Sequence, residues 1–123
     1  MGPARLHILV VDDVVDATDS TTELLSLWGY DAQACYNGTA ALEFARSRRP
    51  DAVLVDLGMP EMTGWDVARA VRQRWPGLAI GLVTGWAVAL EMSDDERRGV
   101  DFVLAKPYTV ETLRSALATV RPV

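Results

Sequence analysis

Chemically active side chains follow four short apolar runs of this sequence. Each run stops at a polar or charged residue, and these are Asp12 and Asp13 after the first run, then Asp56, Thr84 and Lys106. Any one of them alone is best explained as an ordinary surface residue. A fold that brought the four run ends together would collect three carboxylates, one hydroxyl and one ammonium group.

A cluster of three carboxylates needs positive charge to be stable. Two carboxylates about 5 Å apart at an effective dielectric of ~20 repel by ~3 kcal/mol. Lys106 supplies one positive charge, and a hard divalent cation would supply the rest. The chain has one histidine and one cysteine, too few for a zinc-type site. An all-oxygen site for Mg²⁺ is therefore predicted, since Mg²⁺ binds through a few carboxylates and keeps several waters.

The same set of groups is suited to phosphoryl transfer. A metal ion and a lysine neutralise charge on the transferred group, a hydroxyl orients one of its oxygens, and a carboxylate can accept it covalently. The sequence thus predicts a phosphoryl site at which a carboxylate is the acceptor.

The apolar runs have the character of buried strands. They are short, rich in Val, Ile and Leu, and lack polar alternation, as expected of strands covered on both faces. The predicted strands are residues 6–11, 31–35, 52–55, 79–83 and 102–105. Between them lie segments with helical spacing, as in Leu24, Leu25 and Trp28 before a stop at Gly29.

Further helices are predicted near residues 39–47 and 67–75, and a last one from the stripe of Val110, Leu113, Leu117 and Val120. Residues 86–99 are irregular: Trp86, Val88, Leu90 and Met92 alternate with a period of two, and a capping box pairs Ser93 with Glu96. The fourth helix, expected in this segment, either is displaced toward Ser93 or begins near Val88 with a poor amphipathic pattern.

Alternating strands and helices predict an α/β fold with a parallel sheet and helices on both faces. In such sheets the carboxyl ends of the strands meet at one edge, where ligands bind. The residues that end the apolar runs are expected there. His7, at the opposite end of the first strand, is expected to be an ordinary buried residue, as are Cys35 and the tryptophans Trp28, Trp65 and Trp75.

Composition limits the class of protein. The 123 residues fit one domain, half of them hydrophobic, with a net charge of −5. That charge disfavours nonspecific nucleic-acid binding. No apolar stretch approaches the ~20 residues that cross a bilayer, and no secretory signal is present. We expect one domain over residues 1–123, with a cytoplasmic location and no membrane contact.

Four motifs in this order carry a specific resemblance: VVDD (10–13), LVDLGMPEMTGWD (54–66), LVTG (82–85) and AKPY (105–108). The chain resembles the receiver domain of bacterial two-component response regulators over nearly its whole length. The resemblance implies a doubly wound, flavodoxin-like sheet of five strands in the order 2-1-3-4-5.

The resemblance also implies residue roles. Asp56 would accept a phosphoryl group from a histidine kinase or phosphotransfer protein and later lose it by self-catalysed hydrolysis. Mg²⁺ would be held by Asp13, Asp56 and the Gly58 carbonyl, with Asp12 acting through metal-bound water. Thr84 and Lys106 would contact phosphoryl oxygens. A cis Lys106–Pro107 peptide would point the lysine into the cleft. Gly64 would satisfy a backbone requirement for glycine in the turn before the third helix.

Three positions bear on the switch or partner surface: Trp86, Val103 and Tyr108. Many receivers have an aromatic residue three positions before the lysine, where this chain has Val103. Phe102 is one residue away and should therefore face the other side of the sheet. In the family, rotation of that aromatic side chain accompanies the movement of the threonine and relays the signal to the surface. We expect this aromatic switch to be absent here. Trp86 either shields the phosphoryl group or projects outward as a partner contact, unless its segment simply packs on the sheet.

Three other functions agree less well with the sequence. A flavin-binding redox module needs a loop that binds phosphate after the first strand, where Asp12 and Asp13 would repel it. A Mg²⁺-dependent aspartyl phosphohydrolase needs a further acid or base, and Gly58 offers none. A degenerate receiver that signals without phosphate conflicts with the complete set of site residues. A protein that phosphorylates itself, not an enzyme acting on other substrates, fits best.

The setting of the domain stays open. No DNA-binding or enzymatic output domain fits within this length, so the output is expected in another chain or segment. A free-standing regulator, an excised N-terminal domain and the receiver end of a hybrid kinase all agree with the sequence. Family resemblance also implies a homodimer through the irregular fourth helix, the last strand and the last helix.

Overall fold

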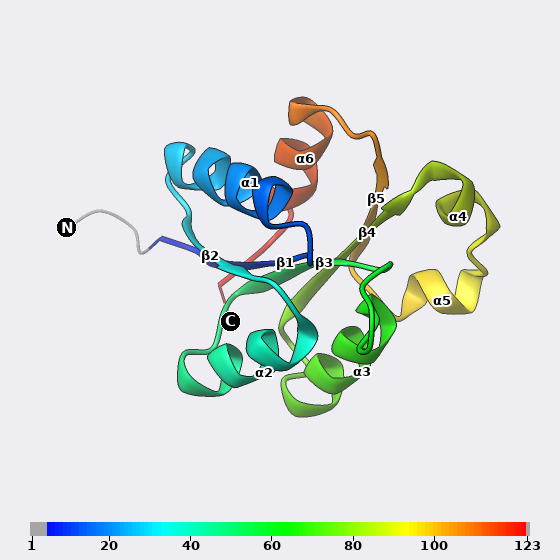
Figure 1. Cartoon of the computed structure of the whole chain (residues 1–123), viewed down its shortest axis with the longest axis horizontal. Helices are drawn as coiled ribbons and strands as arrows, with labels where there is room; N and C mark the ends of the chain where they lie inside the picture. The colour runs from blue at the N-terminus through cyan, green and yellow to red at the C-terminus, as the bar shows by residue number, and fades with distance from the viewer. Residues whose placement is uncertain (1–4, 123) are drawn as a thin grey trace.

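The computed structural model describes residues 5–122, whose strands form one parallel sheet (Figure 1). In sheet order the strands are β2 (Asp31–Cys35), β1 (His7–Val11), β3 (Ala52–Asp56), β4 (Ala79–Gly85) and β5 (Phe102–Lys106). The helices are α1 (Val15–Leu27), α2 (Gly38–Ser47), α3 (Gly64–Arg74), α4 (Trp86–Glu91), α5 (Asp94–Arg98) and α6 (Val110–Leu117). The predicted fold class and strand order are confirmed.

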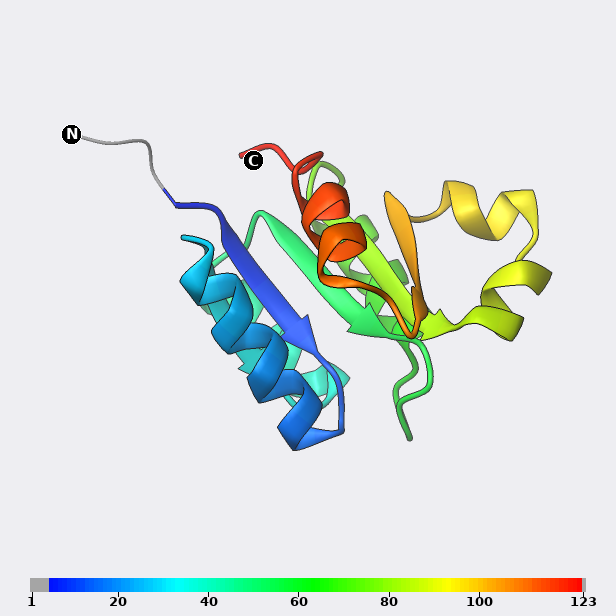
Figure 2. The same cartoon turned by 90° about the horizontal axis from the view of Figure 1, so that it is seen from above.

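Helices cover both faces of the sheet. Figure 1 shows α1 and α6 on one face and α2 and α3 on the other, and Figure 2 shows α1 and α6 from above. Side chains alternate along β1 between two cores, with Ile8 and Val10 packing toward α1 and α6 and Leu9 and Val11 toward α2 and α3. Burial on both faces explains why β1 shows no polar alternation in sequence.

Three of the strands reach one or two residues further than the sequence predicts. Asp56 is the last residue of β3, Lys106 is the last residue of β5, and β4 continues through Thr84 to Gly85. The chemically active residues are therefore held by strand backbone or stand directly beside it. This gives them a fixed position at the carboxyl edge of the sheet.

The predicted helix signals are largely confirmed. Helix α1 ends before Gly29, whose φ of 96° lies in the left-handed region that favours glycine. Leu25 is fully buried, and Trp28 is half-buried against the same core. Trp65 and Trp75 likewise pack half-buried against the core on the other face.

The stripe predicted for the last helix is only partly correct. Leu113 and Leu117 are buried in the core, as expected. Val110 is 54% exposed because it is the first helical residue and lies outside the contact with the sheet. Val120 is buried but follows the helix, which ends at Leu117.

The irregular segment after β4 forms two short helices. Helix α5 begins at the predicted capping box, in which the Ser93 and Glu96 side chains each accept from the other residue's backbone N–H. Helix α4 precedes it from Trp86 onward. Both expected positions thus carry a helix, since the capping box starts a second helix and leaves the first one in place.

The period-two pattern in this segment reflects exposure. Trp86, Val88 and Leu90 are 60%, 48% and 71% exposed, whereas Ala89 and Met92 are buried. The expectation that all of these large side chains pack on the sheet is wrong for the first three. Together they form an apolar surface on α4.

The expectation that Cys35 is a buried apolar residue is confirmed. Cys35 is 5% exposed at the end of β2, and burial raises the pKa of its thiol, so it behaves as a buried apolar residue. Among residues 5–122, no helix combines the length and apolar character needed to cross a membrane.

His7 lies at the start of β1 and is 4% exposed. Its ring packs 5.6 Å from the ring of Phe44, and within residues 5–122 neither ring nitrogen makes a hydrogen bond of normal geometry. Burial lowers the pKa of His7 below its ordinary 6.5, and the positive charge of Arg48 adds to this. Asp31, the Arg49 backbone and Asp51 oppose the shift without reversing it.

The buried His7 predicts a loss of stability in acid. Because its folded-state pKa lies below 6.5, the unfolded chain binds the proton more readily. The stability that neutral His7 contributes is intact above pH 6.5 and is lost as pH falls from 6.5 toward the folded-state pKa. His7→Leu should raise the free energy of unfolding by about 1 kcal/mol at neutral pH, since it removes two buried ring nitrogens that make no hydrogen bond of normal geometry within the described part of the chain.

Urea unfolding of both proteins at about pH 7.5 and about pH 5.5 checks this prediction. His7 is the only histidine, so the difference between the two proteins isolates its titration from that of the carboxylates. The advantage of the variant should grow at the lower pH. An advantage of the same size at both values would contradict the assignment.

Candidate metal centre

Three carboxylates converge at the carboxyl edge of the sheet. Asp12 and Asp13 follow β1, and Asp56 ends the neighbouring β3, one residue beyond the paired Val11 and Val55. One oxygen from each carboxylate lies within 4.8 Å of one oxygen from each of the others. Asp12 is buried, Asp56 is half-buried and Asp13 is exposed, so the cluster opens to solvent on the Asp13 side.

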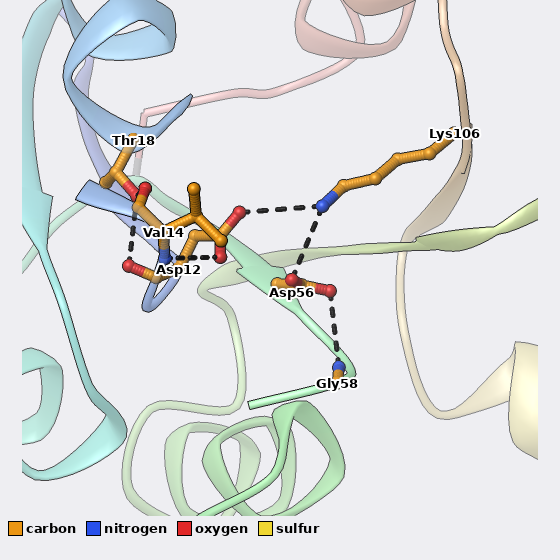
Figure 3. Close-up of polar contacts among 6 residues, drawn as sticks. All are labelled: Asp12, Val14, Thr18, Asp56, Gly58 and Lys106. Carbon is orange, nitrogen blue, oxygen red and sulfur yellow. Dashed lines mark hydrogen bonds and ion pairs between the residues drawn. The ribbon is translucent and has the colours of Figure 1, made fainter. Parts of the chain in front are cut away.

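Lys106 reaches the cluster from the end of β5 (Figure 3). Its Nζ lies 3.4 Å from Asp56 Oδ2 and 3.5 Å from Asp12 Oδ2. Lys106 is the only lysine in the sequence, and the peptide that links it to Pro107 is cis. Among residues 5–122, Lys106 is the only cation that pairs with these carboxylates, and one positive charge against three carboxylates leaves the site with excess negative charge.

The pKa values of Asp12 and Lys106 are shifted by burial and by the neighbouring charges. Burial raises the pKa of Asp12, and the nearby Asp56 carboxylate adds to the rise, while the Val14 N–H and the Lys106 ammonium oppose it. Burial alone would lower the pKa of Lys106, but the Asp56 and Asp12 carboxylates outweigh it and raise that pKa. Lys106 is therefore charged at neutral pH.

The turn after β3 holds Asp56 through Gly58. The Gly58 N–H donates to Asp56 Oδ1 at 3.2 Å. This bond uses the amide group of Gly58, whereas the ligand expected from the family resemblance is its carbonyl. Tyr108, two residues after Lys106, is half-buried and borders a small cavity that Asp12, Asp56 and Lys106 also line.

Thr84, like Asp13, does not line this cavity. It is 5% exposed near the end of β4, where it pairs in register with Ala105. The cavity is lined at that position by the preceding residue, Val83. Val83 and Thr84 face opposite sides of the sheet because successive strand residues alternate.

The other predicted surface residues occupy distinct places. Val103 packs against the core on the α2 and α3 face, whereas Phe102 packs against the opposite core. The sequence prediction that these neighbours face opposite sides is therefore correct. The ring of Phe102 lies over Gly81, which leaves no room for a Cβ at that position. Trp86 is exposed and does not line the cavity.

Gly64 allows the start of α3 to pack against the turn that carries Asp56. Its N–H donates to Leu57 O at 3.2 Å, and a Cβ at this position would lie 2.7 Å from both Asp56 O and Leu57 Cα. These contacts are with backbone atoms that cannot rotate away. Glycine is thus required at position 64 because two chain segments approach each other closely there.

Gly64→Ala should lower the free energy of unfolding by about 1–3 kcal/mol, the usual cost of overpacking. Gly77→Ala is the matched control, because a Cβ at Gly77 would meet no atom within 4 Å. Denaturant unfolding of both variants and of the wild type provides the comparison. Equal stability of the two variants would show that the close approach at Gly64 does not constrain the turn.

Sequence reasoning missed Thr18. It is 1% exposed on α1, and its hydroxyl lies 2.9 Å from the Asp12 carbonyl and 2.7 Å from the Val14 carbonyl. The available signal was its position seven residues before Leu25, which places a polar residue on the buried face of the helix.

The donor set fits a hard divalent cation. It consists of carboxylate oxygens, two of them held at their positions by backbone N–H groups of Val14 and Gly58. Such oxygen ligands, few in number and partly open to water, suit Mg²⁺. The excess negative charge gives a cation a reason to bind.

The receiver-domain family model, described as the response regulator receiver domain, matches residues 8–118. The chain belongs to this family. The receiver domain is 35% identical over 108 residues to the response regulator MprA of Mycobacterium ulcerans, covering 88% of this chain and 47% of that protein. It is 34% identical over 108 residues to MprA of Mycobacterium avium, with the same coverage. The chain spans about half the length of these curated relatives.

Solved structures show the same fold. The receiver domain matches the chemotaxis protein CheY4 of Vibrio cholerae with a TM-score of 0.84 and 28% identity, over 96% of this chain and 100% of that one. It matches the response regulator TrrA of Thermotoga maritima, solved in complex with Mg²⁺ and BeF, with a TM-score of 0.82 and 29% identity, over 92% and 96%.

Proposed function

We propose that this receiver domain is a phosphoacceptor in which Asp56 takes a phosphoryl group from a histidine kinase or phosphotransfer protein. The observation that carries the proposal is the convergence of three carboxylates, with oxygens within 4.8 Å of one another, two of which contact the sole lysine. A protein that only needed to be stable would gain nothing from this concentration of negative charge.

In the proposed reaction an Asp56 carboxylate oxygen bonds to phosphorus as the phosphorus–nitrogen bond of the donor histidine breaks. The electron pair of that bond stays on the imidazole nitrogen, which takes up a proton from solvent. Asp13, Asp56 and the Gly58 carbonyl would hold Mg²⁺, with Asp12 acting through bound water. The bound metal supplies charge neutralisation on the phosphoryl oxygens.

Lys106 is suited to stabilise the phosphorylated state. Its ammonium already contacts Asp56 at 3.4 Å, so it can pair with a phosphoryl oxygen with little movement. We further propose that the Thr84 hydroxyl binds another phosphoryl oxygen. Thr84 is 5% exposed and does not line the cavity in this structure, and we propose that a rearrangement at the end of β4 turns its hydroxyl toward phosphorylated Asp56.

That rearrangement would reach the surface formed by α4, β5 and α6. Trp86 follows Thr84 by two residues and is 60% exposed, which favours a partner contact over a shield for the phosphoryl group. Val103 occupies the core position beside β4 where the family often has an aromatic residue, so the signal would pass through α4 and not through an aromatic rotation. Tyr108, at the cavity edge, would respond to the charge on Asp56.

The receiver would act on itself only, by accepting the phosphoryl group and later losing it to water. We propose that residues 1–123 form a single receiver domain that works in the cytoplasm with a kinase or phosphotransfer protein. A homodimer through α4, β5 and α6 is part of the proposal. Its output would reside in another segment or partner, since the chain covers 47% of the length of the MprA relatives.

Incubation with acetyl phosphate, followed by intact-mass measurement, tests the proposed function. The wild-type protein should gain the mass of one phosphoryl group with Mg²⁺ present and should gain none with EDTA. The adduct should disappear over time as the aspartyl phosphate hydrolyses. No adduct at any Mg²⁺ concentration would overturn the proposal.

A further inference from the structure

The loop that carries Asp12 and Asp13 rests on a buried hydroxyl. The Oγ1 of Thr18 lies 2.9 Å from the Asp12 carbonyl oxygen and 2.7 Å from the Val14 carbonyl oxygen. Figure 3 shows Thr18 on the α1 side of Asp12, away from Lys106. At 1% exposure, the hydroxyl has no access to bulk water as an alternative partner.

The two carbonyl groups do not need this hydroxyl equally. A threonine hydroxyl has one hydrogen to donate. The Val14 carbonyl already accepts the backbone N–H of Thr18 at 3.0 Å. Within residues 5–122, no backbone N–H donates to the Asp12 carbonyl. Donation to Asp12 is therefore the bond whose loss would leave a polar group unpaired.

This bond completes the anchoring of Asp12. The Asp12 N–H donates to the Cys35 carbonyl of β2 at 3.1 Å, and Asp12 Oδ1 accepts the Val14 N–H at 3.1 Å. With its carbonyl held by Thr18, each polar group of Asp12 has a partner on the protein. The carbonyl also belongs to the peptide that joins Asp12 to Asp13, so the hydroxyl fixes the plane from which Asp13 extends.

We infer that Thr18 is a positioning residue that sets the Mg²⁺ affinity of the receiver by holding the Asp12–Asp13 peptide. The inference rests on the proposed function, because it assigns the acidic cluster to Mg²⁺. Asp13 is exposed and its side chain makes no hydrogen bond within residues 5–122, so its carboxylate depends on the backbone for its position. Groups that orient a metal ligand in this way typically change metal affinity about 10–100-fold when removed.

Calorimetric titration of Mg²⁺ into four proteins tests the inference. Thr18→Val keeps the shape of the side chain and removes the hydroxyl, and it should weaken Mg²⁺ binding about tenfold. Thr18→Ser keeps the hydroxyl and should bind within about threefold of wild type. Thr22→Val is the matched control, because the Thr22 hydroxyl makes the same kind of bond, 2.7 Å to the Thr18 carbonyl, one turn away from the site.

Wild-type Mg²⁺ affinity in Thr18→Val, or an equal loss in Thr22→Val, would overturn the inference. Failure of the wild-type protein to bind Mg²⁺ would instead contradict the proposed function. Thr18→Ala carries the same expectation as Thr18→Val and replaces it if the valine variant does not fold.

Phosphorylation by acetyl phosphate provides a second readout. In Thr18→Val the Mg²⁺ concentration at half-maximal rate should rise by the same factor as the dissociation constant. The rate at saturating Mg²⁺ should stay close to that of wild type, because Asp56 and Lys106 are unchanged. A lower rate at every Mg²⁺ concentration would show that Thr18 acts on general stability or on the acceptor itself, and would overturn the positioning role.

Discussion

Asp13→Asn should bind Mg²⁺ at least tenfold more weakly than wild type and, without metal, should be more stable. Both effects come from the negative charge of Asp13, which attracts Mg²⁺ and repels the neighbouring carboxylates. The Asp13 carboxylate contributes negative charge within 4.8 Å of oxygens of Asp12 and Asp56, and it makes no ion pair with Lys106 within residues 5–122. Neutralising Asp13 removes repulsion and breaks no salt bridge among the described residues.

The magnitude follows from the exposure of Asp13. A pair of buried carboxylates would repel by a few kcal/mol, but Asp13 is exposed to water, so about 1 kcal/mol is expected. Glu23→Gln provides the control, since Glu23 is an exposed carboxylate on α1 outside the cluster. It should change neither property. Thermal unfolding with EDTA and calorimetric Mg²⁺ titration measure the two effects, and a less stable metal-free Asp13→Asn protein would contradict the electrostatic account.

Lys106→Met should slow phosphorylation by acetyl phosphate about a hundredfold at saturating Mg²⁺, the usual loss when one donor to the reacting group is removed. Methionine keeps much of the length of the side chain but cannot contact Asp56 or a phosphoryl oxygen as a cation. The affinity for Mg²⁺ should not fall and is expected to rise. Removal of an ammonium 3.4 Å and 3.5 Å from two of the carboxylates removes a competing positive charge.

A slower phosphorylation rate with undiminished Mg²⁺ affinity would show that Lys106 acts in catalysis and that its loss does not simply disrupt the structure. Arg69→Met is the control, since Arg69 is an exposed cation paired with Asp66 on α3, away from the cluster. It should leave the rate and the Mg²⁺ affinity unchanged. A Lys106→Met protein that loses Mg²⁺ affinity along with its rate would indicate that the lysine supports the site structurally.

The sheet and the acidic cluster could be predicted from sequence because each depends on a strong local pattern. Buried parallel strands leave uninterrupted apolar runs, and the edge at which they end follows from the topology. The opposite facing of Phe102 and Val103 followed from strand alternation. Asp12, Asp13, Asp56 and Lys106 therefore met as expected.

Other features depended on contacts that no local pattern records. The exposure of Trp86, Val88 and Leu90 depends on how α4 lies against the edge of the sheet, and α4 and α5 pack as two separate pieces. The position of Thr84 outside the cavity depends on which face of β4 borders it. Thr18 was missed because its role is a bond from the second turn of α1 back to Asp12. In each case the tertiary arrangement decides what the side chain contacts.

The most direct test of the account is the location of the phosphoryl group. Protein treated with acetyl phosphate and Mg²⁺ can be reduced with borohydride, which converts an aspartyl phosphate to homoserine, and then mapped by peptide mass spectrometry. The account predicts modification at Asp56, unchanged modification in Asp94→Asn, where Asp94 is an exposed acidic residue of α5, and none in Asp56→Asn. Modification at any other residue, or an adduct that persists in Asp56→Asn, would contradict it.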